Sequence, residues 1–284
     1  MTATTIKQLP KSSVELDITL PWDEIKAEYQ KVFDEVAAEM ELPGFRKGKA
    51  PKKMIEENIN RPKIYEEVLK RVVPKAYSDA VKENKLQPVS SPKVEVLEAK
   101  ELSPWKLKVT IAQKPKINLK NYKTKVSDLN KSKKTKIWLP GETKKEEPKE
   151  TKAAIAELMD TLASEVEVEI SDILVEDEVN KLLSGLIDQT AKLGMTVEQY
   201  IQARNTTSEK LREDYTKEAL KNLTIEFALA EIADKENITV APEDIDKLLE
   251  KVENSEEKDK LRTQSYYLAH LIRQQKTLDF LASL

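Results

Sequence analysis

The chain has 284 residues, with 48 Lys and Arg against 51 Asp and Glu, and is long enough for two domains of ordinary size. It has no cysteine, which excludes disulfides and thiolate sites. Its single histidine, His270, argues against a Ser-His-Asp triad or a multi-histidine metal site. The first residues lack the apolar stretch of a signal peptide, and no apolar run approaches membrane-spanning length. These features predict a soluble cytoplasmic protein without metal or membrane contacts, and not an enzyme of the usual kinds.

Charge and helix-breaking residues are unevenly distributed along the chain. Residues 1–150 carry 32 Lys and Arg against 23 Asp and Glu, whereas residues 151–284 carry 16 against 28. Twelve of the thirteen prolines lie at or before Pro148, and only two of the five glycines lie beyond residue 150. A stretch so poor in proline and glycine favours helices, so a change of architecture is expected near residue 150.

The pattern of residues 1–114 predicts an α+β domain. Apolar residues alternate with polar ones over 13–20 and again over 94–96 and 105–111, which is typical of half-buried strands. Helical spacing occupies residues 25–40 and begins again at Ile64, and Pro51 suits the start of a short helix between them. The order of strand, helices and two closing strands indicates a domain that ends near Lys114.

Residues 115–149 are predicted to be a lysine-rich linker. From Lys114 to Lys136, both included, there are nine lysines and one acid, Asp128, with few large apolar residues. Such a segment cannot bury enough apolar surface to offset its own ordering entropy. The apolar triplet Ile137-Trp138-Leu139 either anchors this linker to a neighbouring domain or contacts a client protein.

The pattern of residues 150–284 predicts an all-α domain. Apolar residues recur at helical spacing in one segment after another, including one long helix from Leu211 to Ile232 and a last helix over 261–281. Thr196 with Gln199, and Thr206 with Glu209, have the spacing of a capping box at two helix starts.

One short segment has distinctive chemistry. The run Leu42-Pro43-Gly44-Phe45-Arg46-Lys47-Gly48-Lys49-Ala50-Pro51-Lys52-Lys53 contains five positive charges, no acid and two of the five glycines. Because it joins two predicted helices, it should form a loop that exposes Phe45 among cations. An aromatic ring flanked by Arg and Lys suits RNA phosphate, a stacking surface or an acidic protein patch, although a solvated basic turn would have the same composition.

This segment resembles the ribosome-docking signature of the trigger factor family of bacterial chaperones. GFRKGKAP at 44–51 matches the family pattern G-F-R-x-G-x-x-P at every position. Residues 1–114 are similar to the family's ribosome-binding domain, and VEVEISDILVEDEVNKLLSGLIDQTAKLGMTVEQYI at 166–201, with the helices after it, to its helical C-terminal domain. The resemblance implies an elongated, multi-domain protein, with residues 150–284 as the domain that cradles substrates.

The prolyl isomerase domain of this family is not expected here. In the family it lies between the two regions just named, and such a domain needs on the order of 100 residues. Residues 115–149 are too few, and Tyr122 and Trp138 are their only aromatic residues. The chain is therefore predicted to lack isomerase activity, whether the domain was lost naturally or removed.

The resemblance implies an ATP-independent chaperone without a cofactor, in keeping with the absence of a G-x-x-x-x-G-K-[ST] loop. Its partners would be the large ribosomal subunit at the tunnel exit, both protein and RNA, and nascent or unfolded chains, with a homodimer away from the ribosome. Catalytic residues are not expected. The ribosome-binding residues would be Gly44, Phe45, Arg46, Lys47, Gly48, Lys49 and Pro51.

Other functions remain open from the sequence. The chain could be an RNA-binding protein that uses its basic half, or a chaperone that acts mainly off the ribosome, although the acidic second half argues against a general nucleic-acid coat. A residual enzyme built on His270, or on acid pairs such as Asp177 and Glu178, is the remaining alternative. Apolar residues at helical spacing, such as Leu223 and Phe227, fit a buried core better than a surface that binds client proteins.

Overall fold

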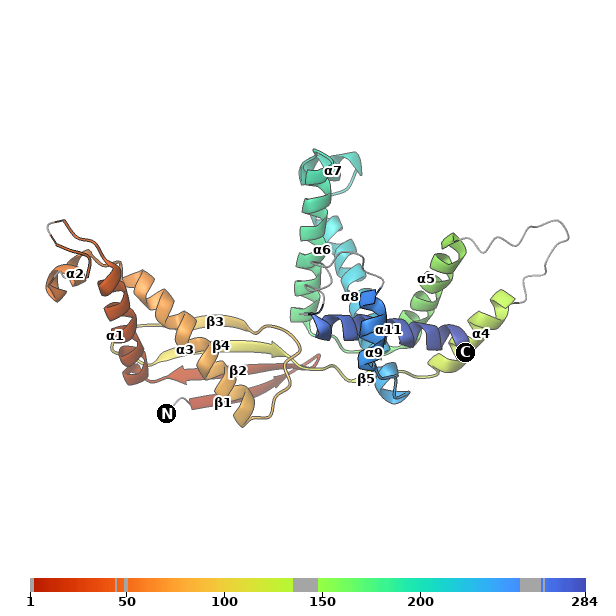
Figure 1. The fold of residues 1–284 in the computed structure, drawn as a ribbon, viewed down its shortest axis with the longest axis horizontal. Coiled ribbons are helices and arrows are strands. Elements are labelled where there is room, and N and C mark those ends of the chain that lie inside the picture. The colour runs from red at the N-terminus through yellow and green to blue at the C-terminus, as the bar shows by residue number, and fades with distance from the viewer. Residues whose placement is uncertain (1–2, 44, 49–50, 135–147, 251–261, 263) are drawn as a thin grey trace. The chain divides into compact units, whose positions relative to one another are not determined.

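The computed structural model describes residues 3–43, 45–48, 51–134, 148–250, 262 and 264–284 (Figure 1). The chain divides into two compact units, Met1–Lys114 and Pro115–Leu284, called unit 1 and unit 2 below. Unit 1 combines a sheet with helices, and unit 2 is almost entirely helical. The predicted fold class, an α+β domain followed by an all-α domain, is confirmed.

Unit 1 is built on a four-stranded antiparallel sheet. Its strands are β1 (Ala3–Leu9), β2 (Ser13–Leu20), β3 (Lys93–Glu98) and β4 (Trp105–Ala112), in the order β1-β2-β4-β3. The alternation predicted for β2 and β4 is confirmed, because every second side chain of both strands is buried. Leu16 lies opposite Val109 and Ile18 opposite Leu107, so both strands direct their apolar residues to the same face.

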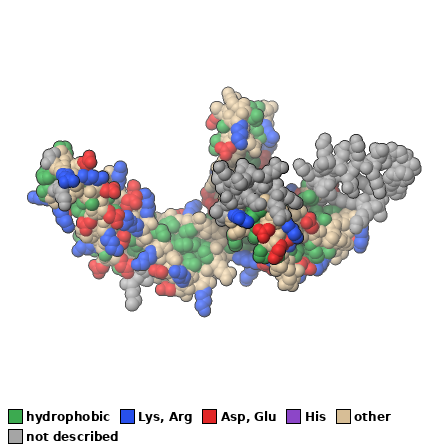
Figure 2. All heavy atoms as spheres, in the orientation of Figure 1, with side chains coloured by type: hydrophobic (Ala, Val, Ile, Leu, Met, Phe, Trp, Pro, Cys, Tyr) green, Lys and Arg blue, Asp and Glu red, His purple; other side chains and the backbone are tan. Residues whose placement is uncertain are grey.

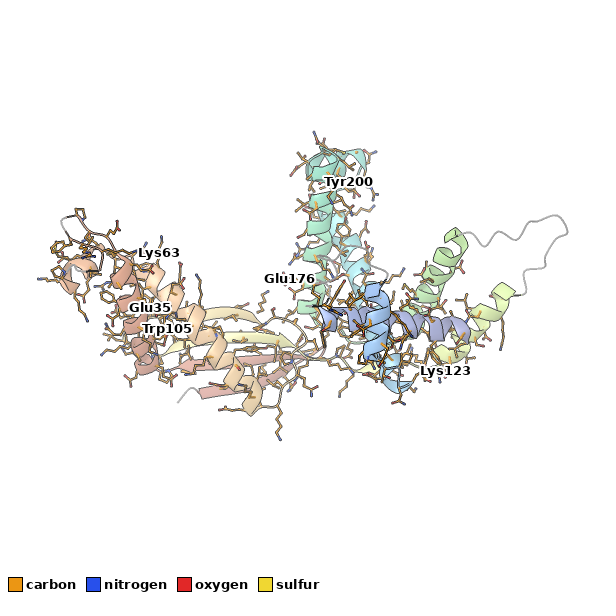
Figure 3. The ribbon with its side chains drawn as sticks, viewed as in Figure 1. Glu35, Lys63, Trp105, Lys123, Glu176 and Tyr200 are labelled. Carbon is orange, nitrogen blue, oxygen red and sulfur yellow. The ribbon has the colours of Figure 1, made fainter. Side chains whose placement is uncertain are left out.

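Three helices complete unit 1, namely α1 (Trp22–Glu39), α2 (Lys52–Asn58) and α3 (Arg61–Glu83). Their apolar residues form one core with the sheet. In this core the buried Trp105 ring, labelled in Figure 3, lies 5.6 Å from the ring of Tyr65, and the Tyr65 ring lies 5.0 Å from that of Tyr29. The core therefore joins β4 to α3 and α1 through aromatic contacts.

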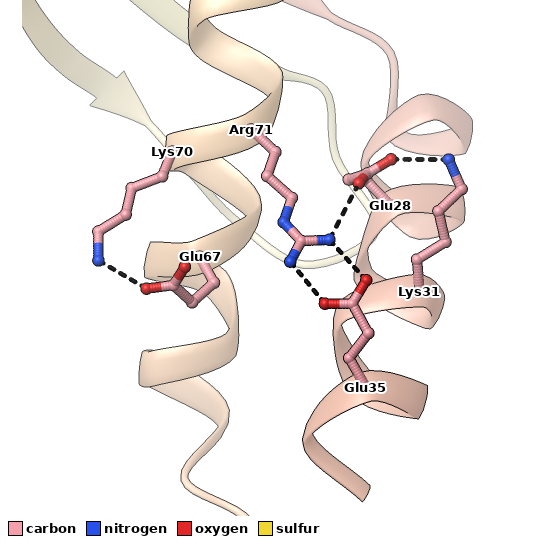
Figure 4. Close-up of polar contacts among 6 residues, drawn as sticks. All are labelled: Glu28, Lys31, Glu35, Glu67, Lys70 and Arg71. Atoms are coloured by element: carbon pink, nitrogen blue, oxygen red, sulfur yellow. Dashed lines mark hydrogen bonds and ion pairs between the residues drawn. The ribbon is translucent and has the colours of Figure 1, made fainter. Parts of the chain in front are cut away.

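A polar network joins α1 to α3 on the surface of unit 1 (Figure 4). The Arg71 guanidinium donates two hydrogen bonds to the Glu35 carboxylate, at 2.9 and 2.6 Å, and lies 3.7 Å from Glu28. This pairing lowers the pKa of Glu35 and raises that of Arg71. A solvent-exposed pair adds little stability, but its two-point geometry holds the C-terminal half of α1 against α3.

Unit 2 contains seven helices among its described residues, together with a small sheet in which β5 (Ile117–Asn118) pairs with β6 (Glu167–Val168). The helices are α4 (Tyr122–Lys134), α5 (Pro148–Glu165), α6 (Asp172–Lys192), α7 (Val197–Ala203), α8 (Ser208–Lys235), α9 (Pro242–Glu250) and α11 (Ser265–Ser283). The long helix α8 packs against α5, α6 and α11, which makes it the central helix of the unit. Among the described helices, none is both long and apolar enough to cross a bilayer.

The structure differs from the linker expected over 115–149, because its first twenty residues belong to unit 2. Leu119, Tyr122 and Val126 are buried in one core with residues of α5, α8 and α11. The Ser127 hydroxyl donates a hydrogen bond to the carbonyl of Leu284 at 3.1 Å. Lys123, Lys125 and Lys131 of the same helix are exposed, so a segment rich in lysine is still amphipathic. The triplet Ile137-Trp138-Leu139 lies outside the described residues.

Candidate functional site

The basic segment singled out in the sequence forms the loop between α1 and α2, residues 40–51, called the tip loop below. Of the seven candidate residues, the structure describes Phe45, Arg46, Lys47, Gly48 and Pro51. Gly44 and Lys49 lie outside the described residues. The two flanking helices belong to the core of unit 1 through Val32 and Phe33 of α1 and Ile55 of α2.

The described candidate side chains of the tip loop face solvent. Phe45 is 39% exposed, and Arg46 and Lys47 are exposed as well. Neither cation makes an ion pair with another described residue. Leu42 packs against the core instead, and its carbonyl accepts a hydrogen bond from the Phe45 N–H at 3.0 Å. The loop therefore presents an aromatic ring and two cations while a neighbouring leucine anchors it.

Gly48 fits the tip loop against the C-terminal end of α1. Its φ is +70°, and its N–H donates a hydrogen bond to the Met40 carbonyl at 3.2 Å. A Cβ at this position would lie 2.7 Å from the carbonyl oxygen of Ala38. Glycine is thus required both by backbone conformation and by the close approach of two main-chain segments.

Pro51 begins the helix on the other side of the loop. It precedes α2, and its carbonyl accepts hydrogen bonds from Met54 at 3.0 Å and Ile55 at 3.2 Å. Lys52 lies 3.8 Å from Asp34 of α1, so both ends of the loop contact the same helix. Met54 is 41% exposed, and the sequence pattern did not single it out, because an isolated methionine in a short helix carries no periodic signal.

Unit 2 offers a second candidate surface, an open groove of about 500 Å³ between α9 and α11. An ion pair between Lys276 and Asp244 at 2.5 Å borders the groove. Its apolar lining is supplied by Leu248, Leu271, Ile272 and Leu278. The sequence pattern assigns Leu223 and Phe227 to a core. In the structure Leu223 is buried and Phe227 is half-buried.

The residues considered for an enzyme are dispersed. His270 is exposed on α11, and Glu178 forms an ion pair with Lys181 one turn along α6, at 3.2 Å. Across the described part of the chain, no group of three His, Asp or Glu side chains could hold a metal ion. These residues occupy ordinary helix surfaces.

Family models match both units of the chain. A model described as bacterial trigger factor protein matches residues 1–137, and one described as bacterial trigger factor protein C-terminus matches residues 134–283. The two matches meet at residues 134–137, so together they account for nearly the whole chain.

Curated trigger factors share moderate identity with parts of this chain. The trigger factor of Desulforamulus reducens is 27% identical over 196 residues, which cover 69% of this chain and 42% of that protein. That of Lactococcus lactis subsp. cremoris is 37% identical over 108 residues, covering 38% and 25%, and that of Natranaerobius thermophilus is 28% identical over 121 residues, covering 43% and 27%. The chain thus spans less than half the length of each of these relatives.

A solved structure has the same fold. It comes from work on promiscuous substrate recognition in the folding and assembly activities of the trigger factor chaperone, and it matches 99% of this chain and 99% of its own with a TM-score of 0.65. At 14% identity this similarity concerns the fold. Since the C-terminal model covers more than half of the chain and the N-terminal model covers the remainder, the chain belongs to the bacterial trigger factor family.

Proposed function

We propose that this protein is an ATP-independent chaperone that docks near the exit of the ribosomal tunnel through the tip loop and holds nascent or unfolded chains. The docking contact is made by Phe45, Arg46 and Lys47, with Gly44, Gly48, Lys49 and Pro51 shaping or extending the loop. Its counterpart is a surface of the large ribosomal subunit that combines protein with RNA phosphate.

The observation that carries this proposal is the exposure of Phe45, Arg46 and Lys47 on a loop anchored at both ends. A large apolar ring kept in solvent costs free energy unless it has a partner. Two cations beside it supply charge-assisted hydrogen bonds to phosphate or carboxylate oxygens. Because Gly48 fixes the loop against α1, these three side chains are presented without a large ordering cost.

Unit 2 is the part that holds clients. Exposed apolar residues on α6, at its C-terminal cap and on α11 could bind unfolded segments weakly: Ile187, Leu193, Tyr266, Tyr267 and Leu271. Residues 115–284 carry 27 Lys and Arg against 33 Asp and Glu, so this surface should favour basic, apolar segments. Release without an energy source requires weak binding, with a dissociation constant on the order of micromolar.

We also propose that this chain has no prolyl isomerase activity. The proposal is supported by the two family matches, which meet at residues 134–137 and leave no residues between them for an isomerase domain. Client holding, rather than catalysis, is then its contribution to folding.

Ribosome co-sedimentation tests the docking assignment. The triple variant Phe45→Ala, Arg46→Ala, Lys47→Ala should lose at least tenfold in ribosome binding, while its free energy of unfolding changes by about 0.5 kcal/mol or less per site, because the three side chains are exposed. The matched control is Lys75→Ala with Lys82→Ala, which removes two exposed cations from α3.

The outcomes separate the possible functions. Undiminished co-sedimentation of the folded triple variant would contradict docking through the tip loop. Equal losses in the triple variant and in the control would indicate non-specific attraction of a basic surface to RNA. Binding to naked RNA as tight as to ribosomes, with a steep salt dependence, would favour the RNA-binding alternative.

A further inference from the structure

The two edges of the unit 1 sheet differ in how they are protected. At one edge, β1 packs Ile6 against the core and exposes the polar residues Thr5, Lys7 and Gln8. At the other edge lies β3, all six residues of which are exposed. Among the described residues no strand pairs with its outer side. An edge of this kind carries unpaired N–H and C=O groups that a further strand can use.

The side chains of β3 add an apolar strip to this edge. Val94 lies opposite Val109, and Val96 lies opposite Leu107. Because Val109 and Leu107 are buried, both valines point to the face of the sheet that carries the core. They are nevertheless 37% and 47% exposed, and neither joins the core. Val89, Leu97 and Leu102 are exposed nearby in the sequence, and Figure 2 shows hydrophobic side chains gathered where Figure 1 draws β3.

On the opposite face of the sheet, charged residues of alternating sign lead to the same edge. Across the sheet, Asp17 of β2 lies opposite Lys108 of β4, and Lys108 lies opposite Glu95 of β3. One residue row therefore alternates in sign from strand to strand and ends on an acid at the edge. Cross-strand pairs of opposite charge stabilise a sheet, and like charges destabilise it, so a fifth strand should place a cation beside Glu95.

We propose that β3 is a binding site for an extended polypeptide segment in which apolar residues alternate with Lys or Arg. The segment adds to the sheet as a fifth strand along Lys93–Val96, placing its apolar side chains beside Val94 and Val96 and a basic one beside Glu95. The pairing stops at Leu97, where a bulge shifts the register between β3 and β4.

Strand addition suits clients of varied sequence, because the main chain supplies much of the affinity and only the alternation of side chains is selected. This site deepens the proposed chaperone function and rests on it, because it identifies a class of client segment. Its residues belong to unit 1 and include none of the tip loop. Loss of ribosome docking and loss of this site can therefore be measured separately.

The test uses the full chain and a fluorescent ten-residue peptide that alternates Val with Lys. We expect saturable binding that slows hydrogen exchange of the β3 amides. Methylating every second backbone nitrogen of the peptide should weaken binding at least tenfold, because the methyl groups remove main-chain donors and keep the side chains. A peptide alternating Val with Glu should bind more weakly than the Val-Lys peptide.

Two variants and a control locate the site. Val96→Lys should weaken binding of the Val-Lys peptide at least tenfold without changing ribosome co-sedimentation. Glu95→Lys should reverse the preference in favour of the Val-Glu peptide, a result that general destabilisation cannot produce. Leu220→Lys, which removes a side chain 40% exposed on α8, should leave peptide binding unchanged.

Three results would overturn the proposal. The first is peptide binding without exchange protection in β3, and the second is equal binding of the N-methylated peptide. The third is a peptide-free dimer that Val96→Lys dissociates, because a second copy of the chain would then be the occupant of the edge. Undiminished ribosome co-sedimentation of the triple tip-loop variant, with peptide binding at β3 intact, would contradict the docking proposal and support the β3 site independently of it.

Discussion

At the scale of single residues, the tip loop depends on Gly48 more than on any cation. The Cβ clash with Ala38 involves a main-chain oxygen in a helix, which cannot rotate away. By contrast, a Cβ on Gly185, in the middle of α6, would meet no heavy atom within 4 Å apart from the neighbouring backbone of its own helix. The two glycines thus form a matched pair, one required by its surroundings and one not.

Gly48→Ala should destabilise unit 1 by about 1–3 kcal/mol, because it combines an unfavourable positive φ with a close main-chain contact. It should also weaken ribosome binding, since relief of the clash displaces Arg46 and Lys47. Urea unfolding measures the stability change. A Trp138→Phe background leaves Trp22 and Trp105, both in unit 1, as the fluorescent reporters.

Gly185→Ala is the control for that substitution. Replacing a glycine inside a helix by alanine should stabilise unit 2 by about 0.5–1 kcal/mol, because alanine has the higher helix propensity. Far-UV circular dichroism follows this change. If Gly48→Ala were as harmless as Gly185→Ala, the close approach of the tip loop to α1 would be wrong.

At the scale of elements, α4 shows how a lysine-rich segment becomes part of a core. Tyr122 and Val126 are four residues apart and therefore lie on one face of the helix. The Tyr122 hydroxyl donates a hydrogen bond to the Glu236 carboxylate at 2.9 Å, and the Lys123 ammonium lies 2.8 Å from the same carboxylate. Burial and this bond raise the pKa of Tyr122, and Lys123 with Tyr122 lowers that of Glu236.

Val126→Ala should reduce the stability of unit 2 by about 2 kcal/mol, because it leaves a cavity among Tyr122, Leu162 and the other buried residues of that core. Lys125→Ala, at the exposed neighbouring position, should change stability by no more than about 0.5 kcal/mol. Urea unfolding followed by far-UV circular dichroism compares the two. Equal stability of both variants would mean that residues 115–134 behave as the linker the sequence suggested.

Helix starts show where local sequence is informative and where it is ambiguous. The capping box predicted at Thr196 and Gln199 is confirmed, with hydrogen bonds of 3.3 and 2.9 Å. The start predicted at Thr206 is wrong by one residue, because Thr207 caps α8 and accepts from the Lys210 N–H at 3.2 Å. Two adjacent threonines offer the same hydroxyl, and tertiary packing of α8 selects between them.

At the scale of the whole molecule, the division at residue 114 changes the charge of each part. Residues 1–114 carry 21 Lys and Arg against 18 Asp and Glu, so unit 1 is only slightly basic. The strong positive charge assigned to the first half of the sequence belongs mainly to lysines of residues 115–149. Attraction to polyanions should therefore depend on the tip loop and on this lysine-rich segment, rather than on unit 1 as a whole.

The same division predicts which fragment retains the client-holding activity. Residues 115–284 should fold cooperatively and suppress aggregation of a refolding client without ATP, because they contain the complete core of unit 2. Residues 150–284 lack Leu119, Tyr122 and Val126. Burial of each of these side chains contributes about 1.5–3 kcal/mol to the free energy of unfolding. This loss approaches the total stability of a domain, about 5–15 kcal/mol.

Light scattering of the client and thermal unfolding compare the fragments, with residues 1–114 as the third. We expect full protection by 115–284, and a lower melting temperature and weaker protection by 150–284. Protection by 1–114 alone, with 115–284 folded and inert, would contradict the assignment of client holding to unit 2.

The sequence by itself determined the features that depend on local pattern. The period-2 alternation of β2 and β4, the helical stripes and the glycine and proline positions of the tip loop predict the class of each unit and the residues of the candidate site. Strand β1 was missed, because Ile6 and Leu9 are its only large apolar residues and their spacing matches no strand period.

Only the tertiary structure decided what depends on contacts between distant segments. It placed α4 in unit 2, since Leu119, Tyr122 and Val126 find their partners more than thirty residues further along the chain. It also left β3 with exposed valines, although their alternation resembles that of the buried strand β4. Periodicity records which face of an element is apolar, and only the position of neighbouring elements decides whether that face is covered.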